Sequence, residues 1–299
     1  MTILKCLELY QIFLESKHMA TNTILAYMSD LDLFYRHCQK ELDVKDFNVS
    51  CISPSLIKQF LLYSVKAKRT NRTISRNLTA IKEFFLFLEQ QEILLDNPSR
   101  KIKSPKYSKK LPHFFTLEEI SQLCNLPATE TVEGIRDKAI IELLYSSGLR
   151  VSEILSIHYR DLDFTQKTVR VLGKGSKKRT IPVTDNALWW IKKYYQYVEA
   201  YQGKCLFLTT KNEPMNRAQL YYLLKKYISN ISLKSGYSPH TIRHSFASHL
   251  LGNGANLYAI KEMLGHSSLG TTEIYTHINP QEIRDAFLQG HPRTGKIKI

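Results

Sequence analysis

A basic stretch rich in proline divides this sequence into two parts. Residues 98–112 contain Pro98, Pro105 and Pro112 and almost no helical pattern of apolar residues. Proline fixes φ and lacks an N–H group, so such a stretch does not continue a helix. We therefore predict an extended linker at 98–112 that joins a domain at 1–97 to a second domain at 113–299. Each part is long enough to bury its own core.

The first part carries four amphipathic helical patterns separated by short joints. They cover residues 4–14, a segment that begins at Thr21 or Asn22, a segment that begins at Ser53-Pro54, and a segment that begins at Thr70. Serine followed by proline is a typical helix start, because the serine side chain caps the helix and proline suits its first position. Four such helices predict a compact helical bundle.

The second part mixes helices with one hairpin. Thr116 and Glu119 have capping-box spacing, and Gly148 ends a helix that begins near Arg136. Residues 168–172 and 179–183 alternate as strands do, around a glycine-rich basic tip. Further helices are expected at about 185–201, 216–231, 240–251 and 256–264. The predicted fold class is mainly α with a small antiparallel β-sheet, as an N-terminal four-helix bundle and a C-terminal α+β domain.

Positive charge is concentrated in three blocks that contain no acidic residue. The chain has a net charge of +15. The blocks lie between Asp46 and Glu83, from Arg100 to Lys110, and between Asp163 and Asp185. A surface that only keeps a protein soluble would intersperse the two signs. Separate basic blocks instead favour a long polyanion held at several places, so we expect a nucleic acid partner.

The cysteines and the apolar runs bear on location. The five cysteines, at positions 6, 38, 51, 124 and 205, are odd in number, scattered and never spaced as C-x-x-C. This pattern argues against a disulfide framework or a zinc site and favours a reducing compartment. No apolar run approaches the length of a membrane span, and we expect neither signal peptide nor transmembrane helix. The expected location is the cytoplasm.

A helix start near the C-terminus carries the most specific candidate site. Ser238-Pro239 opens the helix, and His240 and Arg243 lie three residues apart on one side of it. Ile242, Phe246 and Leu250 supply an apolar stripe that would dock the helix on a core. Backbone N–H groups and the helix dipole favour an anion at such an end. We interpret the site as one that grips a phosphodiester.

Arg150 stands at another helix start, where a positive charge opposes the helix dipole. Two explanations are open on local grounds. Either Glu153, one turn further on, compensates the charge, or Arg150 serves a bound anion.

Five motifs in this order resemble the tyrosine recombinase/integrase family, and most closely its bacterial Xer-type members. They are G-L-R-V-S-E at 148–153, the G-K-G hairpin at 173–175, H-T-I-R at 240–243, L-G-H at 264–266 and Y-T-H at 275–277. Each motif alone is weak, but five in order on a basic two-domain chain are specific. The resemblance covers nearly the whole chain and implies an N-terminal core-binding (SAM-like) bundle and a C-terminal catalytic domain.

The resemblance assigns six catalytic residues. It implies that Arg150, Arg243 and His266 bind the phosphate, that His240 handles the proton of the nucleophile, that Lys174 protonates the leaving 5′ oxygen, and that Tyr275 is the nucleophile. Two arginines suit this task because each can give bidentate hydrogen bonds to phosphate oxygens. Charge alone does not choose among Lys174, Lys177 and Lys178, whereas the family pattern favours Lys174. We assign Glu153 to orienting Arg150.

The expected activity is site-specific DNA recombination through a 3′-phosphotyrosyl intermediate, without a metal ion, ATP or any other cofactor. The Xer resemblance implies resolution of chromosome or plasmid dimers during cell division. It also implies a tetramer on two double-stranded DNA sites, with a second related recombinase and a septal DNA translocase as candidate partners. The alternatives are a phage or mobile-element integrase with the same active site, a topoisomerase with the same nucleophile, and a noncatalytic DNA-binding protein on this fold.

The residues after Tyr275 form a short amphipathic segment that includes Ile283, Phe287 and Leu288. Such a helix can fold back on its own domain. The resemblance instead favours docking into a neighbouring protomer, which would link the subunits of a tetramer, and we expect the second arrangement.

Overall fold

The structure of the protein is a computed structural model. It describes residues 1–104, 113–173, 178–198, 205–231, 237–265 and 279–294. The chain forms two compact units, Met1–Lys110 and Leu111–Ile299. Each unit has its own hydrophobic core, so each is described by itself.

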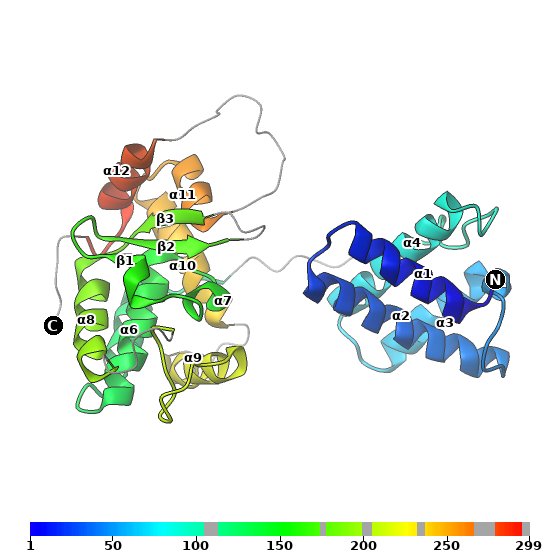
Figure 1. The fold of residues 1–299 in the computed structure, drawn as a ribbon, viewed down its shortest axis with the longest axis horizontal. Coiled ribbons are helices and arrows are strands. Elements are labelled where there is room, and N and C mark those ends of the chain that lie inside the picture. The colour runs from blue at the N-terminus through cyan, green and yellow to red at the C-terminus, as the bar shows by residue number, and fades with distance from the viewer. Residues whose placement is uncertain (105–112, 174–177, 199–204, 232–236, 266–278, 295–299) are drawn as a thin grey trace. The chain divides into compact units, whose positions relative to one another are not determined.

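The first unit is a bundle of four helices with one short 3-10 turn, Val49–Cys51 (Figure 1). The helices are α1 (Ile3–Ser16), α2 (Thr21–Leu42), α3 (Pro54–Lys66) and α4 (Asn71–Gln90). Ser53 and Thr70 cap α3 and α4, each accepting a hydrogen bond from a backbone N–H three residues on, at 3.2 Å. The bundle and two of its predicted starts are confirmed, whereas α2 begins after Ala20 without a side-chain cap.

Aromatic rings fill the core of this bundle. Tyr10 of α1 packs edge-on against Phe84 of α4, and Phe34 of α2 packs edge-on against Phe60 of α3. These pairs join α1 to α4 and α2 to α3, and they contribute beyond the area that they bury. Ile102, within the stretch expected to be a linker, is 5% exposed and belongs to the same core.

The second unit combines eight helices with a small sheet, counted over the residues described. The helices are α5 (Leu117–Asn125), α6 (Val132–Ser147), α7 (Val151–Ile154), α8 (Asp185–Val198), α9 (Arg217–Ile231), α10 (Pro239–Gly252), α11 (Leu257–Leu264) and α12 (Pro280–Gly290). A 3-10 turn at Tyr159–Asp161 precedes the strands β1 (Leu162–Asp163), β2 (Thr168–Leu172) and β3 (Lys178–Pro182). The strands pair antiparallel in the order β1-β2-β3, with Val169 opposite Ile181. The predicted fold class is confirmed, and β1 is an addition to it.

Helix α6 is the centre of the second unit. It is buried along almost its whole length and packs against α8 and α10 (Figure 1). Gly148 ends α6 at φ +60°, as the sequence predicts. A Cβ atom there would lie 2.4 Å from the Phe246 ring, so glycine is required both by the backbone conformation and by the close approach of α10. This turn fixes where Arg150 begins the next helix.

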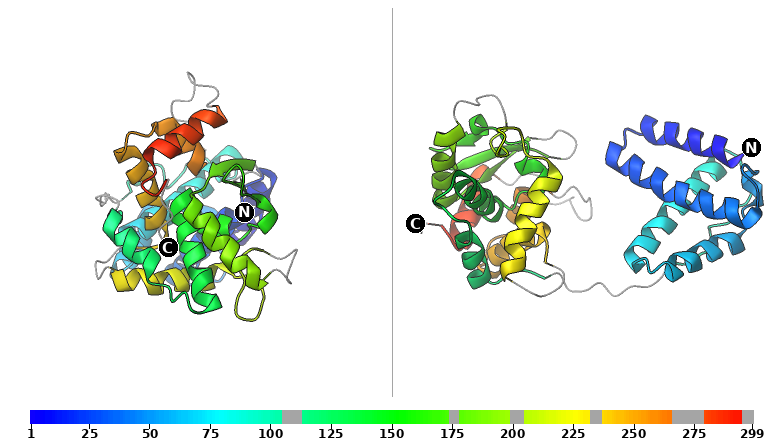
Figure 2. Two further views of the ribbon diagram at one scale, coloured as in Figure 1. Left: turned by 90° about the vertical axis from the view of Figure 1, so that its left-hand side faces the viewer. Right: turned by 90° about the horizontal axis from the view of Figure 1, so that it is seen from below.

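Helix α12 packs on its own unit, against α10 and α11 (Figures 1 and 2). Phe287 is 2% exposed there. In the single chain α12 therefore folds back on its own domain, because its own core offers the apolar side of this helix a place. Docking into a neighbouring protomer stays a prediction.

No helix in the described part of the chain is long and apolar enough to cross a membrane.

Candidate active site

The start of α10 is built as the sequence predicts. Pro239 is its first residue, and the Ser238 N–H donates to Thr241 Oγ1 at 2.9 Å. Ile242, Phe246 and Leu250 are fully buried and anchor the helix. His240 and Arg243 are thereby fixed at the N-terminal end of a helix held by the core.

Arg150 makes the contact with Glu153 that the first of its two explanations requires. Its backbone N–H donates to Glu153 Oε2 at 2.8 Å, and its Nη1 donates to Glu153 Oε1 at 2.8 Å. Its Nη2 donates to the carbonyl of Gly265 at 2.9 Å. A guanidinium has five N–H groups, so three remain for a bound anion. The side chain of Arg150 is 32% exposed, which leaves it open to a ligand.

Three arginines hold the end of α11. Arg179 Nε donates to Met263 O at 3.1 Å, and Arg243 Nη2 donates to Leu264 O at 2.5 Å. Arg150 takes the carbonyl of Gly265, as described above. The last carbonyls of a helix lack intrahelical partners and carry partial negative charge, so guanidinium groups stabilise them. Arg243 also donates to Gly148 O at 2.6 Å, which joins the ends of α6 and α11.

Glu153 lies among these arginines with its side chain 6% exposed. It accepts a bidentate pair from Arg179, at 2.9 Å on each oxygen, and lies 3.9 Å from Arg243 Nη1. Burial alone would raise the pKa of Glu153. The hydrogen bonds from Arg179 and Arg150 outweigh burial and hold the pKa below its usual value. The carboxylate therefore stays ionised and offsets part of the positive charge.

The charged groups of the site favour an anionic ligand. Burial and the neighbouring charge of Arg150 lower the pKa of Arg243 to about 10, even with Glu153 nearby. Burial, followed by the charges of Arg217 and Arg243, lowers the pKa of His240. Arg150, Arg179 and Arg243 face the single carboxylate of Glu153, so positive charge exceeds negative charge at this cluster of described residues, and a phosphate group would offset the excess. His240 is neutral at pH 7 and can accept a proton.

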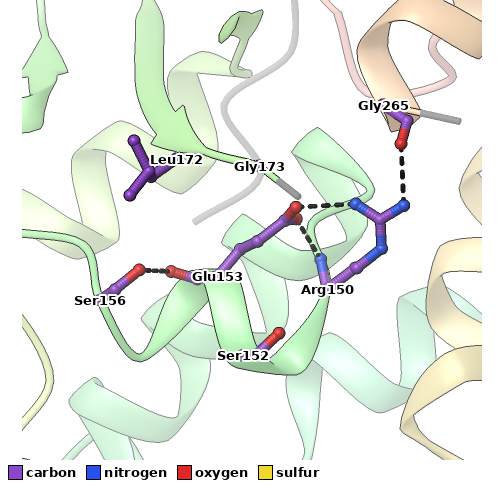
Figure 3. Close-up of a pocket in the computed structure, with 7 residues that line it drawn as sticks. All are labelled: Arg150, Ser152, Glu153, Ser156, Leu172, Gly173 and Gly265. Carbon is purple, nitrogen blue, oxygen red and sulfur yellow. Dashed lines mark hydrogen bonds and ion pairs between the residues drawn. The ribbon is translucent and has the colours of Figure 1, made fainter. Parts of the chain in front are cut away.

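A pocket of about 420 Å³ opens beside Arg150 (Figure 3). Glu153, Leu172, Gly173 and Gly265 also line it. Figure 3 shows the guanidinium of Arg150 between the Glu153 carboxylate and the Gly265 carbonyl. The end of β2 and the end of α11 thus border the same pocket as the arginine.

Of the predicted catalytic residues, the structure brings Arg150, Arg243 and His240 together. Lys174, His266 and Tyr275 lie outside the described residues. The assignment of Glu153 to Arg150 agrees with their two hydrogen bonds.

Arg179 is the residue that sequence reasoning missed. It was one base in a basic block, and no local pattern set it apart from Lys177 or Lys178. In the structure Arg179 lies in β3 with its side chain 14% exposed, and a buried arginine needs a partner, but no sequence signal marked this burial.

Comparisons with known families and proteins agree along the chain. The model of the Phage integrase family matches residues 113–282, and that of the Phage integrase, N-terminal SAM-like domain, matches residues 7–92. The tyrosine recombinase XerD of Staphylococcus haemolyticus is 35% identical over 293 residues, which are 96% of this chain and 98% of that protein. XerD of Staphylococcus epidermidis is 33% identical with the same coverage.

Solved structures share the fold. A lambda integrase (75–356) dimer bound to a COC′ core site has a TM-score of 0.71 at 18% identity, covering 94% of this chain and all of that one. The Tn1549 transposon integrase in complex with transposon right end DNA has a TM-score of 0.72 at 19% identity, covering 94% and 97%. The family matches and the full-length relatives confirm the resemblance found in the sequence: the chain belongs to the phage integrase family, the tyrosine recombinases, and is of the Xer type.

Proposed function

We propose that this enzyme is a site-specific DNA recombinase that cuts and rejoins strands through a 3′-phosphotyrosyl link to Tyr275. The observation that carries the proposal is the pair of guanidinium groups, Arg150 and Arg243, fixed at the ends of α6 and α11 with N–H groups to spare. Negative charge grows on the non-bridging oxygens as a phosphodiester is attacked. Two fixed, always-charged forks stabilise that charge without reorganising.

The remaining roles are those that the family resemblance implies, and chain order beside the pocket supports two of them. Gly173 and Gly265 line it, and Lys174 and His266 are the next residues along the chain. In the proposed step the Tyr275 oxygen forms a bond to phosphorus and the bond from phosphorus to the 5′ oxygen breaks. The phenol loses its proton, with neutral His240 as acceptor, and Lys174 gives a proton to the 5′ oxygen. His266 gives a further hydrogen bond to the phosphate.

The link conserves the bond energy, so a 5′ hydroxyl from a second strand can reverse the step. The proposal therefore needs neither ATP nor a metal ion. We propose as its biological setting a cytoplasmic enzyme that resolves chromosome or plasmid dimers during cell division, and the relatives named XerD support the Xer-type resemblance on which this rests. The partners would be double-stranded DNA, three further protomers in a tetramer on two sites, a second related recombinase and a septal translocase. One related structure is a lambda integrase tetramer bound to a Holliday junction.

The test begins by sequencing the DNA that the Tyr275→Phe variant binds in cells. A duplex with that site, nicked beside the expected cleavage point, is then incubated with the unaltered protein in EDTA without ATP. An SDS-resistant protein–DNA adduct should form. Tyr275→Phe should abolish the adduct, whereas Tyr222→Phe, which alters a 70% exposed tyrosine, should retain it.

An adduct that persists in Tyr275→Phe would refute the nucleophile. Binding without any adduct would favour a noncatalytic DNA-binding protein. Recovery of mobile-element ends in place of one chromosomal site would favour an integrase.

A further inference from the structure

Arg179 joins three parts of the site through one side chain. It projects from β3, the strand that follows the basic tip of the hairpin. Its Nη1 and Nη2 donate to the two oxygens of Glu153 at 2.9 Å each, and its Nε donates to Met263 O at 3.1 Å. The guanidinium of Arg179 therefore links β3 to the start of α7 and to the end of α11.

The face of this guanidinium also supports the turn that ends α11. Gly265 has φ +62°, and a Cβ atom built there would lie 3.1 Å from Arg179 Cζ and Nη1. The backbone of this turn therefore lies directly on the guanidinium plane, where only glycine fits without movement. Arg179 thus supports the turn at Gly265, the residue that directly precedes His266 in the sequence.

The paired hydrogen bonds restrict what Glu153 can do. A carboxylate offers about four lone-pair sites, and Arg179 occupies one on each oxygen. The Arg150 backbone and side chain take the others. Without Arg179, Glu153 could turn toward Arg243, whose Nη1 is only 3.9 Å away. It would then draw toward itself a guanidinium that the phosphate needs.

We propose that Arg179 is a positioning residue of the recombination site: its fork fixes Glu153, and through Glu153 the guanidinium of Arg150, while it supports the end of α11. This role rests on the proposed function. Arg179 itself does not bind DNA, because its side chain is only 14% exposed and each of its three nitrogens already has an acceptor.

The experiment measures single-turnover adduct formation and DNA affinity for the full chain on the nicked duplex defined above. Arg179→Gln should slow adduct formation by about 10- to 100-fold, the scale of an error of about 1 Å in reactive geometry. The slope of log Kd against log salt should not change, whereas loss of one phosphate contact would reduce it by about 0.9. Arg179→Lys should not restore the rate, since an ammonium lacks the fork.

A pH profile separates positioning from general support of the fold. The charged groups that face the Glu153 carboxylate are Arg150, Arg179 and Arg243. Removing Arg179 removes hydrogen bonds that lower the pKa of Glu153. On acidification the variant should therefore lose Glu153 ionisation, and with it activity, at a higher pH than the unaltered protein.

The matched control is Arg136→Gln. Arg136 is also buried beside a carboxylate, Asp137, and donates to the Leu208 carbonyl at 3.0 Å. Its loss should lower the stability of the fold. Below the unfolding temperature, the cleavage rate and the pH at which activity falls on acidification should not change. If Arg179→Gln does not fold, Glu153→Gln tests the same contact from the other side and should slow cleavage similarly.

The outcomes are distinct. Three results would each overturn the positioning role alone. The first is folded Arg179→Gln with an unchanged cleavage rate and an unchanged pH dependence of activity. The second is a slope of log Kd against log salt reduced by about 0.9, and the third is full recovery of the rate in Arg179→Lys. Absence of an adduct with the unaltered protein would refute the proposed function, and the positioning role with it.

Discussion

The segment 291–294, which follows α12, is held by a buried ion pair, and the strength of that pair can be predicted. Arg293 Nη1 donates to Glu142 Oε2 at 2.6 Å and to Cys124 Sγ at 3.0 Å. The Glu142 side chain is 1% exposed, and its other oxygen has no hydrogen-bond partner among the described residues. Arg293→Met keeps most of the apolar stem but leaves this carboxylate buried without its partner.

Breaking a buried pair from one side costs about 3–5 kcal/mol, because the remaining charge is uncompensated. For a unit of this size each kcal/mol lowers Tm by about 2–4 °C, so Tm should fall by about 6–20 °C. The double variant Arg293→Met with Glu142→Gln carries no stranded charge. It should therefore lose less stability than Arg293→Met alone.

The chain contains a convenient probe for this measurement. Its two tryptophans, Trp189 and Trp190, both lie in α8, so tryptophan fluorescence during urea unfolding reports on the second unit. Arg284→Met is the control, since Arg284 bonds Gln166 at the surface of α12 and should cost less than about 0.5 kcal/mol. A loss below about 1 kcal/mol in Arg293→Met would refute the reasoning. A double variant that is less stable than the single one would also do so.

Two further predictions concern acid stability and the basic block of the bundle. Burial lowers the pKa of His291 to about 3 in the folded chain, whereas in the unfolded chain it is about 6.5. Below about pH 6.5 the unfolded chain therefore binds a proton at this residue that the folded chain does not bind. Stability should fall by about 2 kcal/mol between pH 6.5 and pH 5, and His291→Gln should remove that part of the pH dependence in urea titrations; an unchanged dependence would contradict it. Arg76 makes two 2.8 Å bonds to buried Asp30, whereas Arg72 is exposed. Arg72→Gln should therefore reduce the slope of log Kd for DNA against log salt by about 0.9. Arg76→Gln should instead destabilise the first unit and leave this slope unchanged. Equal slopes for the two variants would refute the distinction.

Local sequence was sufficient where local physics decides the structure. Thr116 and Glu119 form the predicted capping box, with hydrogen bonds of 2.9 and 3.2 Å. Gly148 ends α6 in the left-handed conformation that glycine permits. The buried stripe of α10 follows from the helical spacing of its apolar residues, and the paired strands β2 and β3 follow from the alternation of residues along a strand.

Local sequence patterns did not predict the side-chain contacts between distant segments. Arg179 meets Met263 across 84 positions and Glu153 across 26, and nothing near position 179 marks it as different from its basic neighbours. Arg293 likewise meets Glu142 across 151 positions. Pattern also does not place α12, because its apolar side fits either its own core or a neighbour's and amphipathic spacing does not choose between them.

The docked position of α12 limits the reach of the residue proposed to attack DNA. Asn279 caps the helix, accepting a hydrogen bond from the Gln281 N–H at 3.0 Å, and Tyr275 precedes it by only four positions. Four residues span at most about 14 Å when fully extended. A transfer of α12 to another protomer by much more than this distance would have to move Tyr275 as well. The position of α12 thus limits how far from Asn279 the proposed nucleophile can act.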